Sequence, residues 1–398
     1  MAAEADAIDL VRLRSYRLDR LRDQLRIAEL PACVLVDPVN IRYATGTRNM
    51  QVYCLRNPAR YVFVPLEGPV VLFEFHNCEH LSKGIETVDE IRPATTWTFF
   101  KAGDLIDERA RRWADEIADL YHRHCGRRGR LAMDKINPAG AAILARHGIE
   151  VVDAGPPVER ARAIKSADEI ACMGTAIEVC QEGFRRMREA LQPGITEQAL
   201  WAHLHAANIE GGGEYIETRM LTSGPRTNPW FQEASDRAIE AGDLVACDSD
   251  LIGVHGYFAD MSRTFFCEPG QPTGAQRDLY QLAYEQIHHN IDVIRPGLTF
   301  RELAEISWPV PDAFKANRYS AIVHGVGLSG EYPAIVFGDD FDRKGYDGMI
   351  EENMTLSIES YIGRIDGGEG VKLEEIVHVT ENGARALSTF PYEDTLLC

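Results

Sequence analysis

Three aspartates within one β-type stretch constrain this chain more than any other feature. The stretch VACDSDLIGVHGYFADMSRTFF predicts two strands, Val245–Ile252 and Tyr257–Phe266, joined by a glycine-containing turn. Because strand side chains alternate between faces, we expect Asp248 and Asp250 on one side of their strand, with Asp260 facing them from the returning strand. Three carboxylates this close repel one another unless a cation or protons neutralise them. The hairpin therefore predicts a site for hard divalent metal ions.

The length of the chain, 398 residues, favours two domains. Its first part alternates between helical and strand patterns, which indicates an α/β domain. We expect helices at 9–28, 101–123 and 138–146 and strands at 32–36, 61–65, 70–75 and 131–133. A Gly-Pro-Pro sequence at 155–157 predicts the boundary, so that the domains span 1–156 and 157–398. Beyond it, Ser166 and Glu169 form a capping box that begins a helix ending near Ala190.

Composition excludes several classes of protein. No run approaches the roughly 20 apolar residues of a membrane span, and the first residues lack the apolar core of a signal peptide. The nine cysteines show no CxxC spacing, which favours reduced thiols in a cytoplasm over a disulfide framework. A net charge of −19 argues against nucleic acid or an anionic membrane as a partner.

Three further residues stand in settings that favour metal binding. His324 lies in the apolar sequence IVHGVG, where glycines let a ligand approach the backbone. Glu359 and Glu374 each interrupt a β-type run, and a glutamate in a buried strand is costly unless it is paired or metal-bound. Together with the three aspartates they form an oxygen-rich set with one imidazole. Such a set suits two divalent ions bridged by carboxylates.

Each of these six residues also has a purely structural interpretation. A histidine in an apolar strand is more often a hydrogen-bonded core residue, and a strand glutamate often faces solvent at a sheet edge. An aspartate on its own can simply stabilise a turn. The metal interpretation is favoured because the acids lie on separate strands of one domain.

The chain resembles the pita-bread metallopeptidases of family M24, which include Xaa-Pro peptidases, methionine aminopeptidase and the creatinases. The order of the aspartates, the HGVG sequence and the two strand glutamates carry this resemblance, and NIRYATG and KSADEI are similar to the creatinase-type two-domain members. Asp248 and Asp250 precede Asp260 by twelve and ten residues, which is the three-aspartate pattern of the DddP-type dimethylsulfoniopropionate lyases. The segments His205–Glu233 and Asn317–Leu328 are also similar to that branch.

The resemblance implies an α/β (α+β) architecture of creatinase/prolidase type, with an N-terminal α/β domain and a C-terminal pita-bread domain. It also implies a homodimer and a small-molecule substrate. Iron is the expected metal, with manganese, zinc or cobalt as alternatives. The implied ligands of the two-metal centre are Asp248, Asp250, Asp260, His324, Glu359 and Glu374.

The chain departs from the lyase pattern just after the histidine. The lyases carry an aspartate there that removes the α-proton of the substrate, whereas this chain has Gly330. Three alternatives to this aspartate are open, two of them other bases and one a different reaction. Glu331 could take the proton, or Tyr319, which matches a tyrosine of the lyase site, could do so if its pKa is lowered. Alternatively, a metal-bound hydroxide could act on a C–N bond.

The leading hypothesis is a metal-dependent C–S lyase that converts dimethylsulfoniopropionate, or a close analogue, to dimethyl sulfide and acrylate. Such an onium substrate would need aromatic faces, for which Tyr53, Trp97 and Trp230 are candidates, although each could equally pack a core or an interface. The second hypothesis is a hydrolase of the same fold acting on Xaa-Pro dipeptides or small amides. The third is a binding protein without catalysis, which the complete ligand set disfavours.

Overall fold

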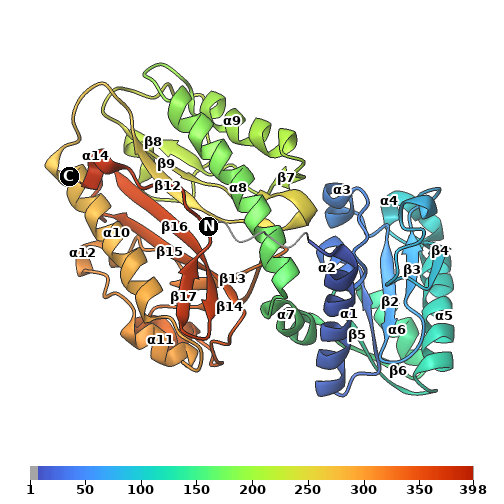
Figure 1. The fold of residues 1–398 in the computed structure, drawn as a ribbon. Helices are drawn as coiled ribbons and strands as arrows, with labels where there is room; N and C mark the ends of the chain where they lie inside the picture. The colour runs from blue at the N-terminus through green and yellow to red at the C-terminus, as the bar shows by residue number, and fades with distance from the viewer. Residues whose placement is uncertain (1–7, 398) are drawn as a thin grey trace. The chain divides into compact units, whose positions relative to one another are not determined.

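The computed structural model describes residues 8–397 and divides into two compact units, Met1–Arg162 and Ala163–Cys398 (Figure 1). The division falls six residues beyond the expected boundary between 156 and 157. The Gly-Pro-Pro sequence begins helix α7 (Gly155–Ala163) instead of forming a linker, because proline is tolerated in the first turn of a helix.

The first unit is built around a six-stranded mixed sheet of order β4-β3-β2-β1-β5-β6. Strand β1 pairs in parallel with β5 and antiparallel with β2, and a short hairpin connects β2 to β3. Its strands are β1 (Ala32–Leu35), β2 (Tyr61–Pro65), β3 (Val71–Glu74), β4 (Glu90–Pro93), β5 (Gly129–Met133) and β6 (Ile149–Asp153). Its helices are α1 (Leu10–Ile27), α2 (Pro38–Thr45), α3 (Gln51–Arg56), α4 (Phe99–Ala102), α5 (Ile106–His124) and α6 (Pro138–Arg146), with short 3₁₀ turns η1 (Glu79–Leu81) and η2 (Gly103–Leu105).

The expected single helix over 101–123 is wrong at its beginning. Gly103, with φ of 52°, separates α4 from the following 3₁₀ turn, and the long helix α5 begins only at Ile106. A left-handed residue cannot continue a right-handed helix, and glycine adopts that conformation without steric cost.

The second unit contains an eight-stranded sheet of order β14-β13-β15-β16-β12-β9-β8, with β17 paired to β16, and a small sheet of order β11-β10-β7. The large sheet comprises β8 (Leu221–Ser223), β9 (Leu244–Asp248), β12 (Ser262–Phe266), β13 (Val323–Val326), β14 (Gly330–Ile335), β15 (Thr355–Gly363), β16 (Gly370–Thr380) and β17 (Gly383–Ala386). The small sheet comprises β7 (Tyr215–Ile216), β10 (Leu251–Ile252) and β11 (Phe258–Ala259).

Helices cover the large sheet on its outer side (Figure 1). Helix α10 packs on β15 and β16 and buries an apolar core that includes Leu356, Ile358 and Leu373. Helix α8 packs on α9. The helices are α8 (Ala167–Ala190), α9 (Glu197–Glu210), α10 (Gly274–Val293), α11 (Phe300–Ile306), α12 (Asp312–Lys315), α13 (Gly338–Lys344) and α14 (Asp394–Leu397), with 3₁₀ turns η3 (Gly224–Thr227) and η4 (Val254–Gly256). The Ser166–Glu169 capping box at the start of α8 is present as predicted.

The aspartate hairpin is interrupted where the sequence predicts two continuous strands. Strand β9 ends at Asp248, and Asp250 lies beyond it with φ of 39°, so strand alternation does not govern its direction. The hydroxyl of Ser249 donates to Ala259 O and accepts from Met261 N, which holds the two arms together at the break. Each arm therefore contributes one strand to the large sheet and one to the small sheet.

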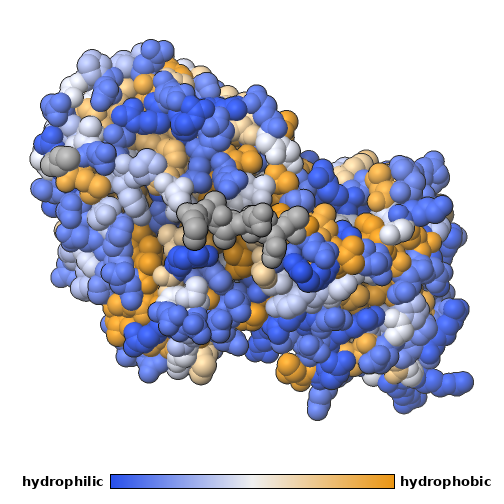
Figure 2. All heavy atoms as spheres, in the orientation of Figure 1, coloured by the Kyte–Doolittle hydropathy of each residue, from blue (hydrophilic) through white to orange (hydrophobic). Residues whose placement is uncertain are grey.

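None of the helices within residues 8–397 combines the length and the apolar character needed to cross a membrane. The face of the molecule in Figure 2 is largely hydrophilic, with hydrophobic side chains scattered among polar ones. This agrees with the acidic composition of the chain.

We predict that Glu74→Gln destabilises the first unit by about 3–5 kcal/mol, because it leaves a buried guanidinium without its counter-charge. Arg60 Nε lies 2.8 Å from Glu74 Oε1, and both side chains are fully buried. Urea unfolding would measure the loss. The control is Glu86→Gln in the partly exposed pair with Arg14, which should change stability by less than about 1 kcal/mol. Equal unfolding midpoints for the two variants would contradict the prediction.

Candidate metal centre

The structure brings the six predicted metal ligands together in the second unit. Most of them end up near one another because of strand register. Glu359 on β15 lies directly opposite Glu374 on β16, and Ser262 on β12 lies opposite both Glu374 and Asp248. The set consists of Asp248 at the end of β9, Asp250 and Asp260 beside the break in the hairpin, His324 on β13, Glu359 on β15 and Glu374 on β16.

His324 is the centre of the cluster. Its Nε2 lies 3.4 Å from Asp260 Oδ2, 3.4 Å from Glu359 Oε1 and 3.6 Å from Glu374 Oε1. Its Nδ1 donates to Gly325 O at 2.9 Å. When the imidazole is neutral, that hydrogen bond keeps the proton on Nδ1 and leaves the lone pair on Nε2. A neutral imidazole held in this way is oriented as metal-binding histidines are.

The carboxylates are buried together at high energetic cost. Burial, followed by the charge of Glu374, raises the pKa of Asp248 and of Asp260 well above the usual range for aspartate. Burial alone would lower the pKa of His324, but hydrogen bonding to Glu359 and Glu374 outweighs it and raises that pKa. These directions describe a pocket with excess negative charge, which positive ions would relieve.

The donor atoms fit divalent metal ions. Asp260, His324 and Glu374 form one group, and Asp248, Asp250 and Asp260 form another, with the donor atoms of each group within 4.8 Å of one another. Asp260 belongs to both groups, as a bridging ligand would. In addition, Asp248 Oδ1 is buried without a hydrogen-bond partner among the described residues. A buried carboxylate oxygen left in this way is explained by a bound cation.

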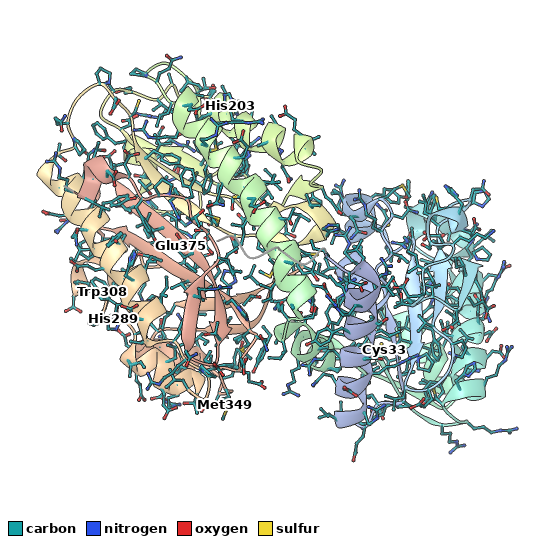
Figure 3. All side chains as sticks on the ribbon, in the orientation of Figure 1. Cys33, His203, His289, Trp308, Met349 and Glu375 are labelled. Carbon is teal, nitrogen blue, oxygen red and sulfur yellow. The ribbon has the colours of Figure 1, made fainter. Side chains whose placement is uncertain are left out.

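Lys372 is a member of the site that the sequence interpretation missed. Its ammonium lies among the carboxylates, 2.7 Å from Glu359 Oε2 and 2.9 Å from Glu374 Oε2. The signal was present, because Lys372 precedes Glu374 by two residues on a strand and must share its face. The next residue along the strand, Glu375 (labelled in Figure 3), belongs to the opposite face and pairs with Arg263.

Tyr319 lies beside this centre. Its ring centroid is 5.0 Å from Lys372 Nζ and 5.3 Å from the ring of Phe231. Burial, followed by the charge of Glu359, raises the pKa of Tyr319, which is opposite to the lowering that a role as base requires. The protein groups around Tyr319 thus favour a phenol that donates a hydrogen bond over a phenolate that accepts a proton.

Glu331 lies on β14 and forms an ion pair with Lys165, in which both side chains are 1% exposed. Its carboxylate also lies against Gly327, where a Cβ atom would approach Oε1 to 2.6 Å. The neighbouring Gly330 is exposed, and a Cβ built on it would meet no atom within 4 Å. Glu331 is therefore held in an ion pair, whereas position 330, occupied by glycine, has space for an acidic side chain.

The three predicted substrate-binding aromatics lie in different units. Tyr53 and Trp97 belong to the first, where Trp97 lines a cavity of about 410 Å³ together with Trp113, whose ring centroid is 5.0 Å away. Trp230 belongs to the second unit. It is buried with Met220, Ala246 and Tyr361, and Tyr319 packs against that group. Of the three aromatics, Trp230 thus lies near the candidate metal centre in the same unit.

Comparisons with known proteins agree with this architecture. The model of metallopeptidase family M24 matches residues 171–381, and that of the creatinase/prolidase N-terminal domain matches residues 17–164. The chain is 37% identical to the dimethylsulfoniopropionate lyase DddP of Roseovarius nubinhibens over 98% of this chain and 88% of that one. It is 34% identical to the lyase of the same name from Roseobacter denitrificans, over 99% and 90%.

Among solved structures, the Xaa-Pro dipeptidase from Bacillus anthracis aligns with a TM-score of 0.77 at 21% identity, covering 96% of this chain and 99% of that one. This match confirms the predicted two-domain creatinase/prolidase-like fold. Together the family models, the relatives and the fold lead to one conclusion: the chain belongs to metallopeptidase family M24, as a metal-dependent enzyme with a creatinase-type N-terminal domain.

Proposed function

We propose that this enzyme is a C–S lyase that eliminates dimethyl sulfide from dimethylsulfoniopropionate or a close analogue. The observation that carries the proposal is the similarity, over nearly the whole chain, to two proteins named for that reaction. The clustering of all three aspartates of the lyase pattern supports it.

The reaction needs three functions from the protein. A base must take a proton from the carbon next to the substrate carboxylate, the C–S bond must break with its electron pair leaving on sulfur, and the carboxylate must be held while a C=C bond forms. The products are dimethyl sulfide, acrylate and one proton. The six ligands would hold two divalent ions, iron before manganese, zinc or cobalt, that act as Lewis acids towards the substrate carboxylate.

The chain offers aromatic surfaces for the sulfonium group. Phe231 is exposed and lies against Tyr319, and Trp230 packs behind them. Aromatic faces attract an onium cation by about 0.5–2 kcal/mol each. We assign Tyr53 and Trp97 of the first domain to the same substrate-binding role. We further propose that the enzyme is a cytoplasmic homodimer and that it binds neither nucleic acid nor a membrane.

One observation favours hydrolysis as the second candidate. Gly330 supplies no proton acceptor, and the adjacent Glu331 is held by Lys165. A site without a carbon-acid base could still hydrolyse a small amide or an Xaa-Pro dipeptide, since that reaction requires an activated water. The tests below separate the two reactions.

We expect the metal-loaded protein to release dimethyl sulfide from dimethylsulfoniopropionate, followed by headspace gas chromatography. Asp260→Ala should lower the rate by more than about 100-fold, because loss of even an outer contact to a metal ligand costs about 10- to 100-fold. Asp278→Ala, an exposed acid on α10, should keep full activity. If a protein shown to contain its metal ions releases no dimethyl sulfide, the lyase proposal is wrong, and proline dipeptides and small amides should be tested as substrates.

Introducing an acid at position 330 should increase lyase activity. The space around Gly330 is open, so Gly330→Asp should fold normally, and a positioned base contributes about 10²- to 10⁴-fold. The matched control is Gly330→Asn, which has nearly the same shape but cannot take a proton. If the two variants show the same rate as the parent, the proton acceptor lies elsewhere in the site.

We assign the proton transfer in this chain to Tyr319 or Glu331, and two variants distinguish them. Tyr319→Phe should lower the rate per metal-loaded molecule by at least about 10²-fold, while leaving stability within about 1 kcal/mol. Glu331→Gln should mainly lower stability, by about 3–5 kcal/mol, because Lys165 loses its buried partner. A folded Glu331→Gln protein that binds metal but releases no sulfide would instead identify Glu331 as the base.

A further inference from the structure

Lys372 is fully buried in the middle of β16, where a lysine needs a specific reason. Four oxygen atoms surround its Nζ: Ser262 Oγ at 2.7 Å, Glu359 Oε2 at 2.7 Å, Glu374 Oε2 at 2.9 Å and Asp248 Oδ2 at 3.3 Å. Three of these belong to residues assigned above as metal ligands. The ammonium is therefore part of the centre and not a distant counter-charge.

The two glutamates use their two oxygens differently. In both, Oε2 accepts a hydrogen bond from Lys372. Their Oε1 atoms point to the other side, where they lie 3.4 and 3.6 Å from His324 Nε2. Ser357 Oγ donates to Glu374 Oε1 at 2.6 Å, and Ser262 Oγ donates to Glu374 Oε2 at 2.7 Å. Lys372 thus fixes the rotation of both carboxylates, so that one oxygen of each faces the imidazole.

The charges also match. The centre holds five carboxylates, those of Asp248, Asp250, Asp260, Glu359 and Glu374. Two divalent ions leave one negative charge uncompensated, and burying an unpaired charge is expensive. One ammonium makes the balance complete while the imidazole stays neutral.

We propose that Lys372 is a positioning residue of the metal centre: it orients Glu359, Glu374 and Asp248 for two divalent ions and supplies the fifth positive charge. The inference rests on the metal centre assigned under the proposed function, but it does not depend on which substrate the enzyme uses. It predicts an effect on metal affinity, which can be measured without any turnover.

The test compares Lys372→Met with Lys165→Met in the full-length protein. Both changes remove a buried lysine from an ion pair with a glutamate, but Lys165 pairs with Glu331, outside the ligand set. Metal content after dialysis would be measured by atomic emission. Affinity for Mn²⁺ and Zn²⁺ would be measured by calorimetry, and thermal unfolding would be followed with and without metal.

We expect two divalent ions per wild-type chain. Lys372→Met should weaken binding by about 10- to 100-fold, as loss of an outer contact to a ligand typically does. Lys165→Met should lower the unfolding temperature but leave affinity and stoichiometry unchanged. If Lys372→Met does not fold, Lys372→Gln, which keeps N–H donors without the charge, should weaken metal binding in the same direction.

Four results would overturn the inference. Unchanged affinity in a folded Lys372 variant would reduce Lys372 to a packing residue. A single ion in the wild-type protein would mean that the ammonium occupies the place of the second ion. Equal loss of affinity in the Lys165 variant would trace the effect to general destabilisation. Absence of metal binding in the wild type would remove the metal centre itself, whereas absence of sulfide release alone would leave this inference standing.

Discussion

The second domain is built around a cluster of carboxylates that repel one another. Five carboxylates are brought together at the interior of an antiparallel sheet, where each raises the cost of ionising the next. The raised pKa values of Asp248 and Asp260 express that cost in the protein itself. A fold can keep such a cluster only if cations or protons neutralise it, and Lys372 already supplies one positive charge. Binding of metal ions at this cluster would therefore also stabilise the domain.

Backbone register brings the acids together before any side chain is adjusted. Four neighbouring strands place Asp248, Ser262, Glu374 and Glu359 in one cross-strand row. The adjacent strand adds His324, just before an irregularity in its pairing with β14. Main-chain hydrogen bonds of the sheet fix these positions, so four of the six candidate ligands are held on strands, while Asp250 and Asp260 lie beside the break in the hairpin. Preorganisation of this kind lowers the entropic cost of binding an ion.

Much of this domain could be predicted from the sequence because its signals are local. Polar residues inside β-type runs pointed to the candidate ligands that the structure brings together, and a capping box identified the start of α8. Asp250 was different: its left-handed conformation follows from the Ser249 contacts that break the hairpin, which no alternation pattern contains. Lys372 was missed because a lysine next to two glutamates resembles a solvated strand edge. Only the pairing of β16 with strands on both sides makes that position interior.

Burial and ion pairing also limit which residue can accept the proton in the reaction. The acid nearest to the glycine-rich turn, Glu331, is buried against Lys165, whose own main chain bonds to Asn353 O. That ion pair connects the start of the domain to the strand that follows His324. Withdrawing Glu331 to serve as a base would leave an ammonium buried at a cost of about 3–5 kcal/mol. Tyr319 has no such ion pair to break, and its ring lies beside Phe231 and the ammonium of Lys372. Burial and the charge of Glu359 nevertheless raise its pKa, so a role as base requires bound metal ions to lower that pKa. The ammonium of Lys372 contacts the carboxylates and also lies near the Tyr319 ring, so Lys372 links the metal centre to the tyrosine beside it.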